Sequence, residues 1–220
     1  MRWKLYWGEL AFVFGSVFLT LGIALQTRAD IGVSMVAAPA YILSLKFDFL
    51  TFGWAEFLVQ GLLFLGYCIV VHRFEYKKLM SFVVAVPYAL LLDACMIAVR
   101  FICPNTMIER LMIFFGGTVI SALGIAFYFR TYFPMLVYEM FVIGISEHYN
   151  ADFNKVKIIY DWTSFMTAVI LSHLFFKAFY GIGIGTILCT IVNGPLIKQW
   201  GKLLDRHMDF KPMIKLKKNN

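Results

Sequence analysis

The densest motif of the chain is a run of alternating glycines, Gly181, Gly183 and Gly185, followed by Thr186. Glycine-rich loops that open a helix can cradle phosphate groups. A nucleotide-binding loop of that kind carries a lysine before its serine or threonine, and Gly185 occupies that place here. Two interpretations stay open: backbone N–H groups that face an anion at a helix N-terminus, or a small-residue helix face, with Asn193 on it, that allows close helix packing.

Several ionisable side chains lie within or at the ends of strongly apolar segments, where a charge is costly to place. Among them, Asp93 is expected to pair with Arg100 or with a lysine of the other copy. Arg28 and Arg130 follow such segments, and they either reach the membrane interface or flank a cavity mouth that attracts anions. Glu56 and Asp161 start equivalent apolar segments, where they either cap helices or serve in gating. Glu139 has apolar neighbours on both sides and is the strongest candidate for a functional carboxylate.

The composition around these residues is that of a membrane protein. Of the 220 residues, 61% are hydrophobic and 15% are charged, and the mean hydropathy is +0.77, far from the balance of soluble domains. Six apolar runs approach the ~20 residues that a spanning helix needs, at 10–25, 54–71, 79–99, 111–129, 158–176 and 182–197. We therefore expect an all-α, polytopic transmembrane bundle and a single integral membrane domain over residues 1–220.

The sequence lacks the constellations that carry catalysis or hold a cofactor. It contains no Ser-His-Asp grouping with a nucleophile elbow and no His-Glu-x-x-His motif. The four cysteines lack Cys-x-x-Cys spacing and the four histidines are scattered, which argues against a metal site. The net charge of +7 lies in loops and in the C-terminal segment, where it is a topology signal. We therefore expect no enzymatic activity, no cofactor and no nucleic-acid partner.

An internal repeat is visible when segment 15–28 is placed on segment 117–130, because half of the positions are identical. The chain is therefore expected to hold two copies of one unit, with repeat 1 over about residues 8–103 and repeat 2 over about 110–200. Residues 201–220 would form a basic cytoplasmic tail. The identical pairs include Gly15 with Gly117, Gly22 with Gly124, and Arg28 with Arg130.

Each copy has the same order of apolar segments: one span, a polar break, a short stretch and two more spans. The short stretches, 33–45 and 135–145, cannot cross a ~30 Å hydrocarbon core at about 1.5 Å per residue. We expect them to be re-entrant, which leaves three spans per copy, six in all, and inverts the second copy. Most lysines and arginines then lie on the side of the termini, which predicts that both termini are cytoplasmic. Eight crossings give the same side for the termini with a slightly weaker charge bias.

Two segments resemble the YczE/YitT group of bacterial membrane proteins, and the YczE side most closely. They are "LGIALQTRADIGVS" (21–34) and "GIGIGTILCTIVNGPLI" (181–197). The chain departs from the group's pattern at Met35, where similar proteins carry proline. The resemblance implies a polytopic protein of the bacterial inner membrane, and it implies no substrate.

Inverted repeats with short, broken helices are typical of secondary transporters, whose binding site lies where the copies meet. We therefore expect transport of a small solute, with anions among the candidates, by alternating access in which one repeat rocks on the other. The alternative is a non-transporting accessory or scaffold protein that assists a partner membrane protein; a homo-oligomer is also open. The candidate substrate or gating residues are Arg28, Arg130, Glu139, Glu56, Asp161, Gly181, Gly183, Gly185, Thr186 and Asn193, with Gln60 and Tyr138 as further hydrogen-bonding groups.

Overall fold

The structure, a computed structural model, describes residues 8–71, 76–131, 133–208 and 210. Within these residues the chain forms eight α-helices and no β-strand, which confirms the all-α prediction. Both copies show the order long, short, long, long. The helices are α1 (Gly8–Ala29), α2 (Ala38–Lys46), α3 (Phe52–Val71), α4 (Tyr76–Ala98), α5 (Met107–Tyr128), α6 (Val137–His148), α7 (Phe153–Phe176) and α8 (Ile184–His207).

Five helices, α1, α3, α4, α5 and α7, are long and apolar enough to cross a membrane. The sixth expected span, 182–197, falls in α8, which has 24 residues but is less apolar, so it stays a prediction. Helix α8 continues to His207, and residues 201–207 are therefore helical rather than the start of a tail. Residues 211–220 of the expected tail lie outside the described residues.

The α1 and α5 helices lie side by side and antiparallel, joined through the repeated glycines. A Cβ atom on Gly22 would lie 2.6 Å from the carbonyl oxygen of Gly117, and a Cβ atom on Gly124 would lie 2.8 Å from that of Gly15. Each contact made by one copy is thus returned by the equivalent residues of the other, as in a two-fold interface. Because the two helices are antiparallel, the copies run in opposite directions, as three spans per copy require.

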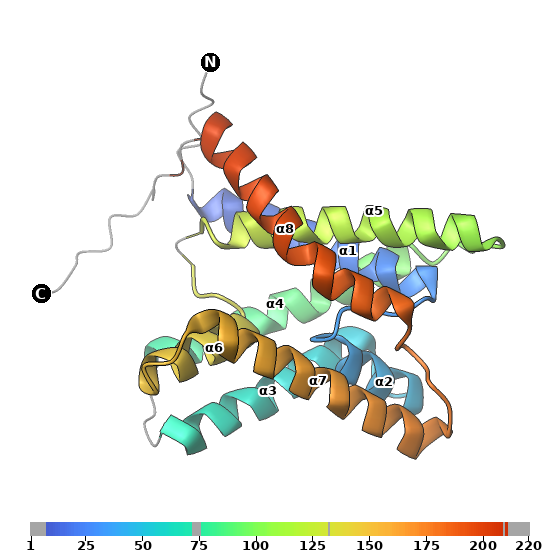
Figure 1. Cartoon of the computed structure of the whole chain (residues 1–220), viewed down its shortest axis with the longest axis horizontal. Coiled ribbons are helices and arrows are strands. Elements are labelled where there is room, and N and C mark those ends of the chain that lie inside the picture. The colour runs from blue at the N-terminus through green and yellow to red at the C-terminus, as the bar shows by residue number, and fades with distance from the viewer. Residues whose placement is uncertain (1–7, 72–75, 132, 209, 211–220) are drawn as a thin grey trace, which may run out of the picture.

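The short helices α2 and α6 belong to hairpins that return to the side they entered. We call the end where α1 ends and α8 begins the distal end, and the opposite one the terminal end. Before α2, Asp30 pairs with Arg110 at the start of α5 (2.9 Å), and after α2, Phe47 makes an edge-to-face contact with Phe175 near the end of α7. Both partners lie at the distal end. The equivalent segment around α6 begins and ends at the terminal end (Figure 1), so neither short helix runs from one end of the molecule to the other, in agreement with the re-entrant segments that the sequence predicts.

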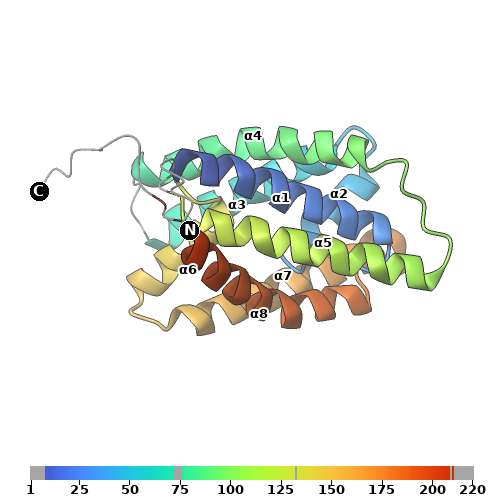
Figure 2. The same cartoon turned by 90° about the horizontal axis from the view of Figure 1, so that it is seen from above.

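The helices form two groups, and each group takes two helices from each copy. Helices α4, α1, α5 and α8 lie side by side in that order and form what we call the four-helix layer (Figure 2). Helices α2, α3, α6 and α7 pack around one another beneath it and form the four-helix ring (Figure 1). The glycine contacts of α1 and α5 join the two copies within the layer, and the expectation that one repeat rocks on the other stays a prediction.

Close helix-to-helix packing between the layer and the ring lies on one side, although Leu19 and Ile23 of α1 also reach the buried cluster around Phe52 of α3. Helix α4 packs on α3, where Phe57 stacks on Phe82 with ring centroids 4.7 Å apart, and on α6. On the other side, within the described part of the chain, α8 contacts neither α7 nor α2. Figure 1 shows α7 and α8 diverging from the segment that joins them. The pair α3–α4 corresponds to α7–α8 in the repeat, so equivalent helix pairs are closed in one copy and open in the other.

Candidate functional site

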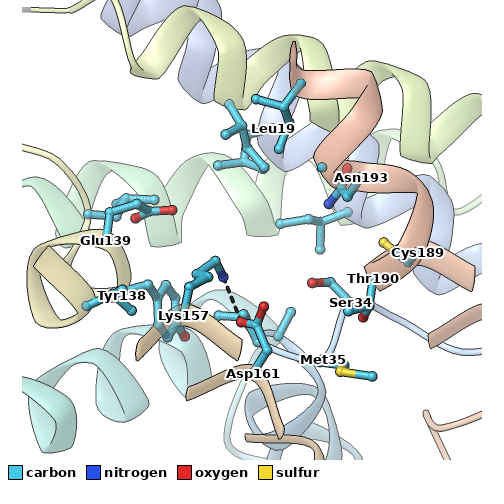
Figure 3. A pocket seen from close by; sticks show the side chains of 18 of the residues that line it. Leu19, Ser34, Met35, Tyr138, Glu139, Lys157, Asp161, Cys189, Thr190 and Asn193 are labelled. Carbon is cyan, nitrogen blue, oxygen red and sulfur yellow. Dashed lines mark hydrogen bonds and ion pairs between the residues drawn. The ribbon is translucent and has the colours of Figure 1, made fainter. Parts of the chain in front are cut away.

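A cavity of about 330 Å³ lies between the layer and the ring, where α7 and α8 separate (Figure 3). Its charged lining residues all come from the ring: Glu56 on α3, Glu139 on α6, and Lys157 and Asp161 on α7. The layer contributes apolar and neutral polar side chains. These are Leu19, Ile23, Tyr88, Ile125, Phe129, Cys189, Thr190, Asn193 and Ile197.

Glu56 is the most deeply buried charged group of the cavity, with 1% of its surface exposed. The Tyr138 hydroxyl donates a hydrogen bond to Glu56 Oε2, whereas Glu56 Oε1 is buried and has no partner among the described residues. Gln60, one turn further along α3, accepts a hydrogen bond from the Val137 backbone N–H at 3.4 Å. Residues four apart share a helix face, so one polar face of α3 holds the beginning of α6.

Glu139 stands in the first turn of α6, where the helix dipole favours a carboxylate. Its Oε2 is buried and finds no partner in the part of the chain that the structure describes. The same holds for Asn193 Oδ1 on α8. Figure 3 shows Glu139 and Asn193 on opposite sides of the cavity. Together with Glu56 Oε1, three buried acceptor atoms therefore belong to residues that line one cavity.

Lys157 and Asp161 form an ion pair on α7, with 2.6 Å between Nζ and Oδ1. Their side chains are 41% and 18% exposed. The sequence suggested Asp161 as the counterpart of Glu56, but the helices begin at Phe52 and Phe153, which aligns Glu56 with Lys157 instead. Sequence reasoning missed Lys157, although a lysine four residues from an aspartate is a common helix-surface pair.

Arg130 lies outside the cavity and fastens the end of α5 to α8. Its Nε and Nη2 donate to the two carboxylate oxygens of Asp205, each at 2.6 Å, and its remaining donors reach the carbonyl oxygens of Ala126 and Gly201, both at 2.7 Å. Two-pronged guanidinium–carboxylate pairs are strong and directional. The Arg130 guanidinium thereby holds the pKa of Asp205 below its usual value.

Arg28 also lies outside the cavity, in a separate hollow at the distal end that Asp93 and Arg100 share. The two arginines are equivalent in sequence and lie at opposite ends of the molecule, as the inverted copies require. Neither lines the cavity. The two arginines therefore give no support for an anionic solute in this cavity.

The alternating glycines lie where the α7–α8 connection crosses the polar break after α1. Gly181 has φ +69°, a conformation that favours glycine, and its carbonyl oxygen accepts from the Val33 N–H at 3.2 Å. The Gly185 N–H donates to the Ile31 carbonyl oxygen at 2.9 Å. A Cβ atom on Gly183 would lie 2.4 Å from that same oxygen. The glycines thus permit two backbones to approach closely.

The backbone N–H groups of Gly183 and Gly185, which an anion at this helix N-terminus would need, are already hydrogen-bonded within the protein. The Gly185 N–H is bonded to Ile31, and the Gly183 N–H donates to the side chain of Thr186, which is fully buried, at 3.3 Å. Helix α8 begins at Ile184, so Gly181 precedes the small-residue face on which it was expected. The crossing joins the start of α8 to the segment after α1 at the distal end.

A second contact closes the distal end between α3 and α4. The carboxylate of Asp93 accepts hydrogen bonds from the Gly53 N–H at 2.7 Å and from the Thr51 hydroxyl at 2.6 Å. A Cβ atom on Gly53 would lie only 2.0 Å from the Ala89 carbonyl oxygen, so the two backbones touch there. We call this contact of Thr51, Gly53, Ala89 and Asp93 the distal clasp. No motif in the sequence predicts this contact.

Comparison with known proteins identifies the family. The chain matches the "Family of unknown function (DUF6198)" over residues 7–202 and belongs to that family. It is 27% identical to the "Uncharacterized protein YyaS" of Bacillus subtilis (strain 168) over 194 residues, which cover 88% of this chain and 92% of the relative. No solved structure matches it. These matches do not confirm the resemblance to the YczE/YitT group.

Proposed function

We propose that this member of the family is a secondary transporter of a small solute in the bacterial inner membrane, and that it works by alternating access. One observation carries the proposal. The equivalent helix pairs α3–α4 and α7–α8 are packed in one copy and separated in the other, around a cavity with buried charged groups. In inverted-repeat transporters, an exchange of conformations between the copies moves the opening to the other side.

On this proposal, the two parts that move relative to one another are the four-helix layer and the four-helix ring. The layer would tilt on the ring, so that α8 closes on α7 at the terminal end while the distal clasp between α3 and α4 separates. The terminal end carries Arg130, Lys155 and Lys202, among other basic residues, and by the positive-inside rule it faces the cytoplasm. On this assignment both termini are cytoplasmic, and the described conformation is open to the inside.

Cysteine accessibility tests this proposal without knowledge of the solute. Thr190 lines the cavity and is exposed, whereas the neighbouring Cys189 is only 1% exposed. Thr190→Cys can therefore report access once the four native cysteines (Cys68, Cys95, Cys103 and Cys189) are replaced by serine. A membrane-impermeant maleimide is applied to right-side-out and inverted vesicles. We expect the thiol at position 190 to react mainly from the cytoplasmic side.

Two cross-linked variants then fix the gates. A disulfide between Thr51→Cys and Asp93→Cys should hold the distal clasp closed and leave the thiol at position 190 reactive from the cytoplasmic side only. A disulfide between Phe153→Cys and Ile197→Cys should form when α7 and α8 close, and should expose the thiol at position 190 to the outside only. The matched single-cysteine variants serve as controls. If the second disulfide never forms, or the thiol at position 190 stays accessible from one side in every variant, the protein does not alternate and an accessory role is favoured.

A further inference from the structure

The cavity contains an excess of hydrogen-bond acceptors that lack donors. Among the described residues, Glu56 Oε1, Glu139 Oε2 and Asn193 Oδ1 are buried and unpartnered. Buried polar atoms in folded proteins almost always have a partner, and an unpaired buried carboxylate is especially costly. Three such atoms from residues around one cavity indicate a ligand that brings donors.

The charges of the cavity point in the same direction. Three carboxylates line it, Glu56, Glu139 and Asp161, against a single basic side chain, Lys157. Lys157 pairs with Asp161 and its charge also acts on Glu139, but it is one positive charge among three carboxylates. The arginines that could have attracted an anion lie elsewhere. A cation would therefore find an excess of two carboxylates over basic side chains.

The walls favour an organic cation over a metal ion. The described residues contain no cluster of three or more side chains placed to ligate a metal, and Ca²⁺ or Mg²⁺ needs about six oxygen ligands. A cavity of about 330 Å³ lined mainly by apolar and aromatic side chains is suited to a small organic molecule. Tyr88 on α4 and Tyr138 on α6 offer ring surfaces that attract cations.

We infer that the solute is a small organic cation with N–H donors, such as a primary ammonium or guanidinium compound, bound between Glu56 and Glu139 with Asn193 as a further acceptor. This inference rests on the proposed transport function and names its substrate class. Glu56 is the principal anchor, because it is almost fully buried and Tyr138 holds its other oxygen in place.

Binding to the purified full-length protein in lipid nanodiscs tests the inference, and three probes of matched shape separate charge from size. These are benzylammonium, benzyl alcohol and benzoate, measured by titration calorimetry against empty nanodiscs. We expect benzylammonium to bind at least tenfold more tightly than the alcohol, and benzoate to bind most weakly. Loss of one charge-assisted hydrogen bond should weaken binding about ten- to a hundredfold.

Glu56→Gln should therefore weaken benzylammonium binding by that factor and leave benzyl alcohol binding unchanged. Glu139→Gln should act in the same direction. The matched control is Glu147→Gln, which makes the same change on the exposed last turn of α6, outside the cavity. If benzylammonium binds no better than benzyl alcohol, or if Glu147→Gln weakens it as much as Glu56→Gln, the inference is wrong. Sodium binding that requires Glu56 while benzylammonium fails would overturn the organic class in favour of an inorganic ion.

The outcome is separate from that of the accessibility experiment, because binding in nanodiscs needs no change of access. Tight benzylammonium binding with one-sided labelling of Thr190→Cys would describe a cation-binding protein that does not transport. Two-sided labelling with preferred binding of benzoate would describe a transporter of another substrate class.

Discussion

The distal clasp allows one substitution to bias the protein toward its other conformation. In Gly53→Ala, the new Cβ atom would lie 2.0 Å from the Ala89 carbonyl oxygen, about 1.4 Å short of ordinary van der Waals contact at 3.4 Å. The obstacle is backbone, so rotation of a side chain cannot relieve the clash. The distal ends of α3 and α4 must separate, which also stretches the hydrogen bond from Gly53 to Asp93.

The size of the effect follows from the cost of overpacking, about 1–3 kcal/mol. Only the closed clasp bears this cost, so the ratio of distal-open to distal-closed molecules should rise about five- to a hundred-and-fifty-fold. The assay is the initial rate at which impermeant maleimide labels Thr190→Cys from the outside, with the four native cysteines replaced by serine. We expect this rate to rise in Gly53→Ala and labelling from the cytoplasmic side to fall.

Gly66→Ala is the matched control, because it makes the same change on the same helix at a position where the added Cβ atom meets nothing within 4 Å. Replacement of a helical glycine by alanine also adds about 0.5–1 kcal/mol of helix stability, and the control contains that contribution as well. The reasoning is refuted if Gly53→Ala remains folded and labels from the outside no faster than Gly66→Ala.

Two further predictions concern the contacts that hold the fold. Asp205→Asn should lower the free energy of unfolding at neutral pH, and by only about 1 kcal/mol because the Asp205 side chain is largely exposed. Arg130 lowers the folded-state pKa of Asp205. The stabilisation is therefore present above the unfolded-state pKa and is lost as the pH falls toward the folded-state pKa. Thermal unfolding of the two proteins should therefore converge in acid, and a constant difference would contradict the assignment. Gly183→Ala should destabilise the protein by about 1–3 kcal/mol, since its Cβ atom meets the Ile31 carbonyl oxygen. Gly194→Ala, where nothing lies within 4 Å, should not, and equal melting temperatures would show that the crossing is not closely packed.

The sequence predicted the helical class and the two short re-entrant helices, because both depend on local properties. The lengths of the apolar runs decide which segments can span a bilayer, and a stretch such as 33–45 is too short in any tertiary context. The identity of Gly15 with Gly117 and of Gly22 with Gly124 indicated equivalent helices. It could not show that these glycines would meet one another, because packing between distant segments is not encoded in spacing along one helix.

Which candidate residues line the cavity and which lie outside it also depends on tertiary structure. Arg28 and Arg130 occupy equivalent positions in the two copies, yet Arg130 pairs with Asp205 on α8 while Arg28 lies in a distal hollow. Glu56 and Glu139 belong to different copies, and only the packing of α3 on α6 brings them to one cavity. Asp93 was expected to pair with a basic side chain, but its partners are a hydroxyl and a backbone N–H at the start of α3, which have no sequence signal.

The two copies share a backbone plan but not their charges, and on the proposed mechanism this difference determines where a cation is released. Glu56 and Gln60 of α3 stand where α7 carries Lys157 and Asp161. In the described state α3 is packed against α4, so Glu56 is buried, while the Lys157–Asp161 pair lies on the open side and is partly exposed. Exchange of the two conformations would bury the ion pair and bring water to Glu56. Because charge interactions weaken as water enters, a cation bound at Glu56 would be held in the described state and released after the exchange, toward the distal side.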